Sequence, residues 1–154
     1  MEQSTSTPKK GFLQELQQRR TELRDSMSAL EHALATPAVG RTGWAERVHV
    51  ALVELSADLR EHVRITEGPD GLYTELLEAA PRLSAAMDQL AKEHAVMGEA
   101  MEDLLNQVTS PDAKTDVERV RELGTRLLGT LVRHRQRGAD LVYEAYEFDI
   151  GGDT

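Results

Sequence analysis

The sequence has no cysteine, few aromatic residues and no long apolar run, and each absence excludes a class of protein. Without cysteine, the chain has no disulfide, no thiolate metal ligand and no cysteine nucleophile. No segment approaches the roughly 18 consecutive apolar residues of a membrane span, and the polar start lacks the apolar centre of a signal peptide. We therefore expect a cytoplasmic protein that does not bind membranes.

Positive charge is also scarce, because 18 lysines and arginines stand against 27 aspartates and glutamates, for a net charge of -9. Nucleic-acid binding depends mainly on basic surfaces that contact phosphates, so a nucleic-acid partner is not expected. The abundant residues are those that lose little rotamer freedom in a helix, which predicts an all-α protein. With 154 residues the chain fits one domain.

Four long segments carry apolar residues at steps of three, four or seven, the period of one buried helix face. A turn containing Gly68, Pro69 and Gly71 separates the second long segment from a short linking helix. Ser110 and Thr115 offer alternative N-caps for the last helix. The predicted helices cover residues 12–35, 44–66, 72–80, 83–108 and a last segment that ends near residue 148.

Short connections between four amphipathic helices are typical of an antiparallel four-helix bundle. We expect the bundle to occupy residues 11–148. The polar, aperiodic start predicts a disordered arm over residues 1–10, and residues 149–154 a flexible tail.

Three of the five histidines fall on the apolar faces of different helices. At about 100° per residue, His62, His94 and His134 lie on the centre line of each face, whereas His32 and His49 point away from it. A buried imidazole needs a hydrogen-bond partner or a metal, and bundles build metal and cofactor sites from side chains on facing helices. The three inward histidines are therefore candidate metal ligands.

The stretches that surround these histidines are REHVRITEGPDGLYTELLEAAPRL, LAKEH and LVRHRQRGADLVYEAYE. In helix order and spacing they resemble the hemerythrin-like (HHE cation-binding) domain family. The resemblance implies a four-helix bundle with a non-haem di-iron site held by histidines and carboxylates. It implies that the ligands here would include His62, His94 and His134.

The chain departs from the family pattern in its other ligands. Arg20 stands where the first helix of the family carries a histidine. The nearest carboxylates after His62 and His94 are Glu67 and Glu99, five residues on, which a π-bulge would have to turn inward before they could bind metal. Three further carboxylates flank the histidines and could orient the rings, although exposed charges are the simpler interpretation. They are Glu61, Glu93 and Glu144.

Small residues occupy the positions four residues after each histidine, where a ligand would be expected. They are Thr66, Gly98 and Gly138. Glycine inside a helix is unfavourable by about 0.5–1 kcal/mol relative to alanine, so its presence indicates either close helix packing or space for a ligand. A planar cofactor such as haem would use that space, with Met97, Met101 and Leu141 as its lining.

Three hypotheses follow. The first is a protein that binds iron, as a di-iron or mononuclear site, or a related divalent metal, and that binds, senses or reacts with oxygen, nitric oxide or peroxide. The second is a haem or small-molecule binder whose pocket is enlarged at Gly98 and Gly138. The third is an interaction module without metal. Neither enzymatic turnover nor the oligomeric state follows from the sequence.

Overall fold

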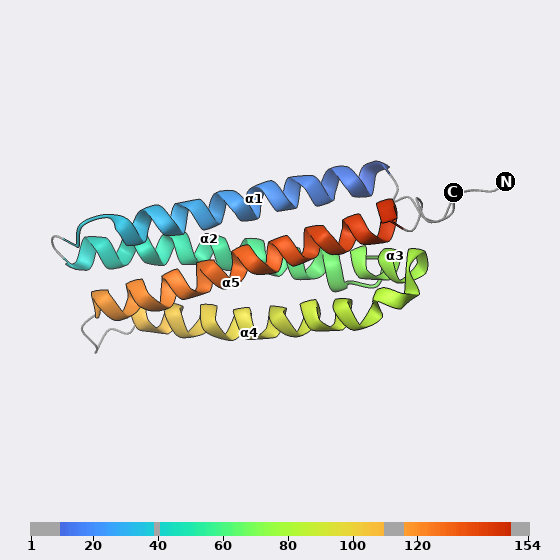
Figure 1. The fold of residues 1–154 in the computed structure, drawn as a ribbon. Coiled ribbons are helices and arrows are strands. Elements are labelled where there is room, and N and C mark those ends of the chain that lie inside the picture. The colour runs from blue at the N-terminus through green and yellow to red at the C-terminus, as the bar shows by residue number, and fades with distance from the viewer. Residues whose placement is uncertain (1–9, 39–40, 110–115, 149–154) are drawn as a thin grey trace.

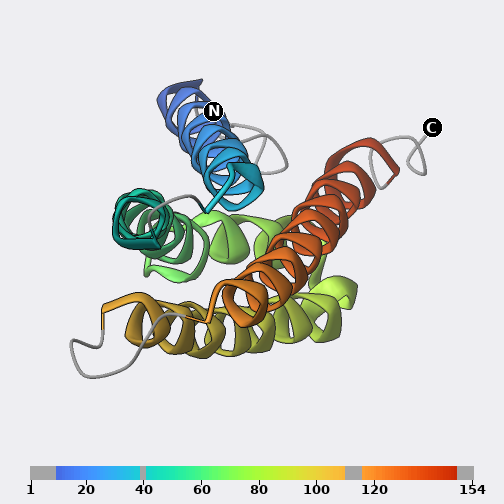
Figure 2. The same cartoon turned by 90° about the vertical axis from the view of Figure 1, so that its left-hand side faces the viewer.

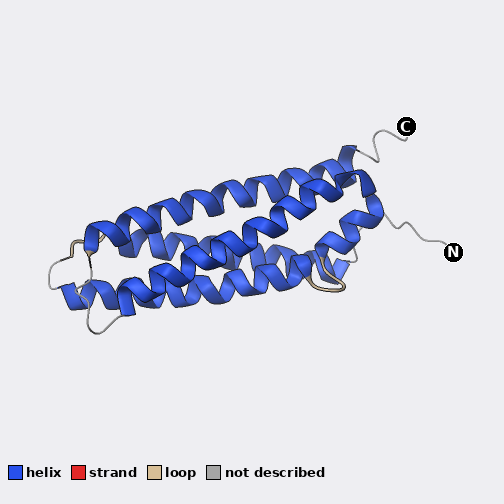
Figure 3. Cartoon of the chain, turned by 90° about the horizontal axis from the view of Figure 1, so that it is seen from below, coloured by secondary structure: helices blue, strands red, loops and turns tan. Residues whose placement is uncertain are grey.

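The computed structural model describes residues 10–38, 41–109 and 116–148, and within these ranges all regular structure is helical (Figures 1 and 3). The predicted all-α fold is confirmed. The predicted arm and tail lie outside the described residues, except for Lys10, which begins the first helix. The elements are α1 (Lys10–Ala35), α2 (Arg41–Glu67), α3 (Leu72–Ala79), the 3₁₀ turn η1 (Pro81–Leu83), α4 (Ser84–Thr109), α5 (Val117–Tyr143) and the π-helical turn η2 (Glu144–Phe148).

The four long helices lie side by side as a bundle, with α3 at one end (Figures 1 and 2). Around the bundle, α1 packs on α2, α2 on α4 and α4 on α5, and α5 closes the ring against α1 through the smallest of these contacts. In the part of the chain described, we find no helix with the length and apolar character of a membrane span.

Two groups of buried apolar side chains fill the bundle. The larger group consists of buried apolar residues that lie between positions 23 and 34 of α1, 44 and 59 of α2, 97 and 104 of α4, and 120 and 131 of α5. The smaller contains α3, η1 and the adjoining ends of the long helices, including Leu16, Leu90 and Leu141. On every long helix except α1, a histidine stands between the two groups, so the three histidines share one level of the bundle.

Connections follow the predicted turn chemistry with one correction. Gly71 must be glycine, because a Cβ there would lie 2.6 Å and 2.9 Å from the carbonyl oxygens of Ile65 and Thr66. The N-cap of α5 is Asp116, whose side chain accepts a hydrogen bond from the backbone N–H of Arg119 at 3.1 Å. The proposed caps Ser110 and Thr115 lie outside the described residues.

The helices α1 and α5 approach each other closely at Gly124, for which the sequence pattern made no prediction. A Cβ on Gly124 would lie 2.6 Å from the Leu34 side chain. Nearby, Arg121 donates to the carbonyl oxygens of Leu34 and Thr36, both at 2.9 Å, and so binds the free carbonyls at the end of α1. This contact fixes the register between the two helices.

Candidate metal centre

Three imidazole rings from α2, α4 and α5 meet in the bundle. Nε2 of His134 lies 3.0 Å from Nε2 of His94 and 3.2 Å from Nε2 of His62. The three potential ligand atoms all lie within 4.8 Å of one another. His94 and His134 are buried, and His62 is partly exposed on the side that faces a cavity. The structure therefore brings together the three histidines that helical periodicity selected, which we call the histidine cluster.

Carboxylates hold the outer nitrogens of two of these rings. Nδ1 of His94 contacts Oε2 of Glu67, the last residue of α2, and Nδ1 of His134 lies 2.7 Å from Oε1 of Glu93 on α4. Arg137 donates to the other oxygen of Glu93 at 2.6 Å. Each ring is thus oriented by a carboxylate from the neighbouring helix.

These carboxylates also decide where the ring protons are. An ionised carboxylate can only accept a hydrogen bond, so Nδ1 of His94 and Nδ1 of His134 carry the protons. With the Nδ1 protons directed at the carboxylates, the Nε2 atoms of His94 and His134 face each other across 3.0 Å, and in the neutral tautomer each of them is an acceptor. A bound cation would resolve this contact between acceptors.

Burial favours the neutral form of His62 and His134. Desolvation, with smaller contributions from His94, His134, Arg135 and Arg20, lowers the pKa of His62 to about 3. Desolvation also lowers the pKa of His134, although the hydrogen bond that His134 donates to Glu93 opposes that shift. Neutral imidazole is the form that binds metal, so these two ligands do not have to lose a proton near neutral pH.

Glu93 responds differently to the same environment. Burial alone would raise the pKa of its carboxyl group, but the hydrogen bonds from Arg137 and His134 outweigh this effect, and the pKa is lowered overall. Glu93 therefore stays ionised, as the assignment of the His134 proton requires.

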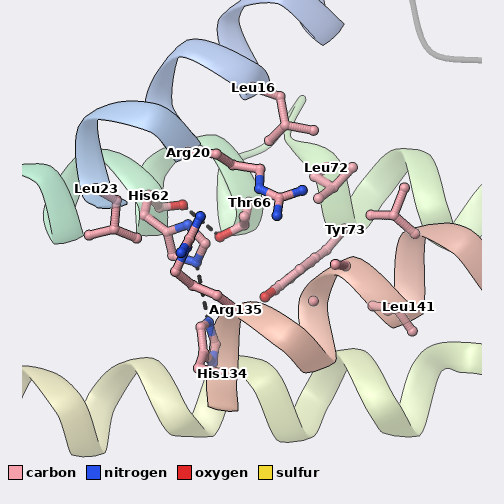
Figure 4. Close-up of a pocket in the computed structure, with 13 residues that line it drawn as sticks. Leu16, Arg20, Leu23, His62, Thr66, Leu72, Tyr73, His134, Arg135 and Leu141 are labelled. Atoms are coloured by element: carbon pink, nitrogen blue, oxygen red, sulfur yellow. Dashed lines mark hydrogen bonds between the residues drawn. The ribbon is translucent and has the colours of Figure 1, made fainter. Parts of the chain in front are cut away.

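A cavity of about 80 Å³ lies between α1, α3 and α5 and opens onto the histidine cluster (Figure 4). His62 and His134 form part of its wall, whereas His94 lies on the other side of the cluster. Its other polar lining residues are Arg20, Thr66, Tyr73 and Arg135. The remaining lining is small or apolar and consists of Leu16, Leu23, Leu72, Gly138, Ala139, Leu141 and Val142.

The small residues that follow the three histidines by four positions lie in different surroundings. Thr66 is buried, and its hydroxyl donates to the carbonyl oxygen of His62 at 2.8 Å. Gly138 lines the cavity, with nothing within 4 Å of an added Cβ. Gly98 is exposed on α4, also with nothing within 4 Å, and Met97 is fully buried in the larger apolar group. Close helix packing therefore explains neither Gly98 nor Gly138.

The carboxylates are likewise distributed differently from the family pattern. Glu67 binds the outer nitrogen of His94 and does not point at the centre of the histidine cluster. Glu99 is exposed and lies outside the group of potential ligands found among the described residues. Glu61 pairs with Arg64 at 3.0 Å, and Glu144 lies 3.9 Å from Arg82. Of the three flanking carboxylates only Glu93 orients a ring, and that ring belongs to His134.

Sequence reasoning did not identify Tyr73 and Arg135 as site residues. Tyr73 packs with its ring parallel to that of His94, with 6.1 Å between centroids, and burial raises the pKa of its hydroxyl. Arg135 follows His134 directly but sits among exposed arginines in the sequence. For Arg135, the only signal in the sequence that it belongs to the site was its position directly after an inward histidine.

Comparisons of the chain with models of protein families, with curated proteins and with solved structures give no significant match. The function is therefore argued from the geometry of the histidine cluster and its cavity.

Proposed function

We propose that this protein binds one divalent transition-metal ion through Nε2 of His62, His94 and His134. The observation that carries the proposal is the convergence of the three Nε2 atoms, two of them 3.0 Å apart, with the outer nitrogens of His94 and His134 held by carboxylates. Histidine ligands commonly donate their other N–H to a carboxylate, which fixes the tautomer and strengthens the ligand. Glu67 and Glu93 would serve in this way.

Two of the three distances fit such an ion. With metal–nitrogen bonds of about 2.0–2.1 Å and angles of about 90–110°, neighbouring ligand nitrogens lie about 2.8–3.4 Å apart. The separations of 3.0 Å and 3.2 Å from His134 fall in this range, and the ligand atoms of His62 and His94, which lie within 4.8 Å of each other, would move closer on binding the same ion. Hydrogen bonds between the rings would give similar distances, but in the neutral tautomers that the two carboxylates favour, the contact between His94 and His134 has no donor.

The ligand set favours a single ion over the di-iron site that the resemblance to the hemerythrin-like family suggests. A metal pair needs bridging carboxylates, whereas Glu67 and Glu93 are engaged on the outer side of the rings. Neutral imidazoles suit iron, zinc, copper or nickel, and we propose iron or a related divalent metal.

Haem is less well supported than a metal ion. The cavity at Gly138, of about 80 Å³, is far smaller than the roughly 300–1,000 Å³ of pockets for larger organic ligands, and of the three histidines only His94 lines the wider hollow of about 570 Å³ at Gly98. The gap of 3.0 Å between two of the rings also leaves no space for a porphyrin between them.

Three protein ligands leave coordination positions open, as in catalytic metal sites. The side of the histidine cluster formed by His62 and His134 faces the cavity, whose volume suits a molecule of a few atoms. We propose that small ligands such as oxygen, nitric oxide or peroxide reach the ion there. The metal supplies the redox chemistry or Lewis acidity, while the cavity walls limit the size of the ligand.

Metal titration tests the proposal. The metal-free protein should bind one equivalent of Fe²⁺, or of Co²⁺ or Zn²⁺ as substitutes, and each of His62→Ala, His94→Ala and His134→Ala should weaken binding strongly. His32→Ala and His49→Ala are the matched controls, because both side chains lie outside the histidine cluster. If the native protein binds no metal while its fold is intact, the interaction module without metal becomes the better hypothesis. A Soret band in freshly purified protein would instead support haem.

A further inference from the structure

Two arginines from different helices face the cavity beside the histidine cluster. Arg20 extends from α1 toward Thr66 and Leu72, and Arg135 extends from α5 toward His62 (Figure 4). The cavity lining contains these two cations and no aspartate or glutamate. Within the described residues neither arginine forms an ion pair, although most other arginines of the bundle do.

This arrangement is unfavourable as it stands. Arg20 is exposed, whereas Arg135 is partly buried, and desolvation, with smaller contributions from Arg20 and Arg24, lowers the pKa of Arg135. Nε of Arg135 is also buried without a hydrogen-bond partner. A buried donor without a partner is expensive, and unpaired like charges at a cavity are typical of sites that hold an oppositely charged ligand.

We propose that the cavity binds a small planar oxyanion between Arg20 and Arg135. Guanidinium groups pair with planar oxyanions through two parallel hydrogen bonds, and such a contact would satisfy Nε of Arg135. The volume of about 80 Å³ limits the anion to a few heavy atoms. Carboxylate and nitrite share this chemistry.

The remaining walls fit such a ligand. The hydroxyl end of Tyr73 points into the cavity near Thr66 and offers a further hydrogen-bond donor (Figure 4). Leu72, Leu141 and Val142 contribute apolar lining. The cavity therefore accommodates an anion with a very short apolar end, and it excludes larger ones.

This inference goes beyond the proposed metal site and does not depend on it, because the arginines rather than a metal hold the anion. The two sites can be separated experimentally, since His94 belongs to the histidine cluster but does not line the cavity. His94→Ala should lose metal binding and keep anion binding. If metal binding fails altogether, the anion site is still testable in the metal-free protein.

The test is an NMR titration of metal-free protein, kept in chelator and low-chloride buffer, with formate, acetate and nitrite. We expect saturable shifts of the backbone amides of Gly138 and Ala139, which line the cavity. Arg20→Gln and Arg135→Gln should each weaken binding at least tenfold. Arg133→Gln is the matched control, because that exposed residue lies on the same helix outside the cavity and should bind anions like the native protein.

Thermal melting and a benzoate titration add two further measurements. Without anion, Arg135→Gln should melt at or above the temperature of the native protein, because it removes repulsion from Arg20. The larger planar anion benzoate should not bind at this site. Shifts that do not saturate, equal affinity in Arg135→Gln and Arg133→Gln, or tight benzoate binding at the same amides would overturn the proposal.

Discussion

Substitution of Glu93 tests the histidine cluster, because this nearly buried carboxylate accepts hydrogen bonds from both His134 and Arg137. Its side chain is 14% exposed, and its oxygens accept hydrogen bonds from Nδ1 of His134 at 2.7 Å and from Arg137 at 2.6 Å. Glu93→Gln keeps the shape of the side chain and removes its charge. One amide NH₂ group then faces a donor, so one of the two hydrogen bonds is lost.

The expected magnitude follows from these contacts. Removing a carboxylate that supports a metal-binding histidine typically lowers metal affinity about 10–100-fold, which is about 1.4–2.8 kcal/mol. The electrostatics agree in direction, since desolvation lowers the pKa of His134 and Glu93 opposes that lowering, which keeps the imidazole a stronger ligand than it would be without the carboxylate. Folding of the metal-free protein should be weakened by less than about 3 kcal/mol, the upper range for a hydrogen bond to a charged group.

Competition for Co²⁺ or Zn²⁺ against a chromophoric chelator measures this loss. Glu99→Gln is the matched control, because Glu99 is an exposed carboxylate of the same helix and should not affect affinity. If the Glu99 variant lost affinity and the Glu93 variant did not, the ligand assignment would be wrong, and a carboxylate closer to the family pattern would be binding the ion.

Three other predictions concern the fold. The pKa of His62 is about 3 in the folded protein, against 6.5 for an unperturbed histidine. The unfolded chain therefore binds a proton that the folded protein excludes, and the free energy of unfolding falls as the pH drops from 6.5 toward 3. Metal-free protein should therefore lose roughly 2 kcal/mol between pH 7.5 and pH 5 in urea titrations, and His62→Gln should lose less. Gly98→Ala should stabilise the protein by about 0.5–1 kcal/mol, because the added methyl group meets no other atom within 4 Å, whereas Gly124→Leu should destabilise it by about 1–3 kcal/mol through overpacking against α1. Arg121→Ala should lower the unfolding midpoint followed by tryptophan fluorescence, because it frees two carbonyl groups at the end of α1 and removes a cation 5.4 Å from the indole centroid.

The fold was predictable because each long helix carries one uninterrupted apolar stripe. Leu23, Leu52, Leu104 and Leu131, one from each predicted stripe, are all at most 2% exposed. The same period selected the three inward histidines. Their equal depth was not predictable, since it depends on the lengths of the connections and on how far each helix slides along its neighbours.

Contacts between helices explain what sequence reasoning missed. Glu93 flanks His94 in the sequence but orients His134 on α5, a pairing that helical periodicity within α4 does not contain. Glu67 reaches its partner from the last residue of α2 without a π-bulge in that helix. Gly98 and Gly138 each follow an inward histidine by four residues, yet only Gly138 lines the cavity. Four residues turn a helix by about 400°, so the glycine is offset by about 40° from its histidine and can face the surface.

The central claim is that three Nε2 atoms hold a single ion, and X-ray absorption of the metal-loaded protein tests it most directly. The account predicts one metal per chain, a first shell of nitrogen or oxygen at about 2.0–2.1 Å, and outer-shell scattering from three imidazoles. His94→Ala should remove one imidazole from that pattern. A metal–metal vector with bridging carboxylates, or a first shell without imidazole, would contradict it.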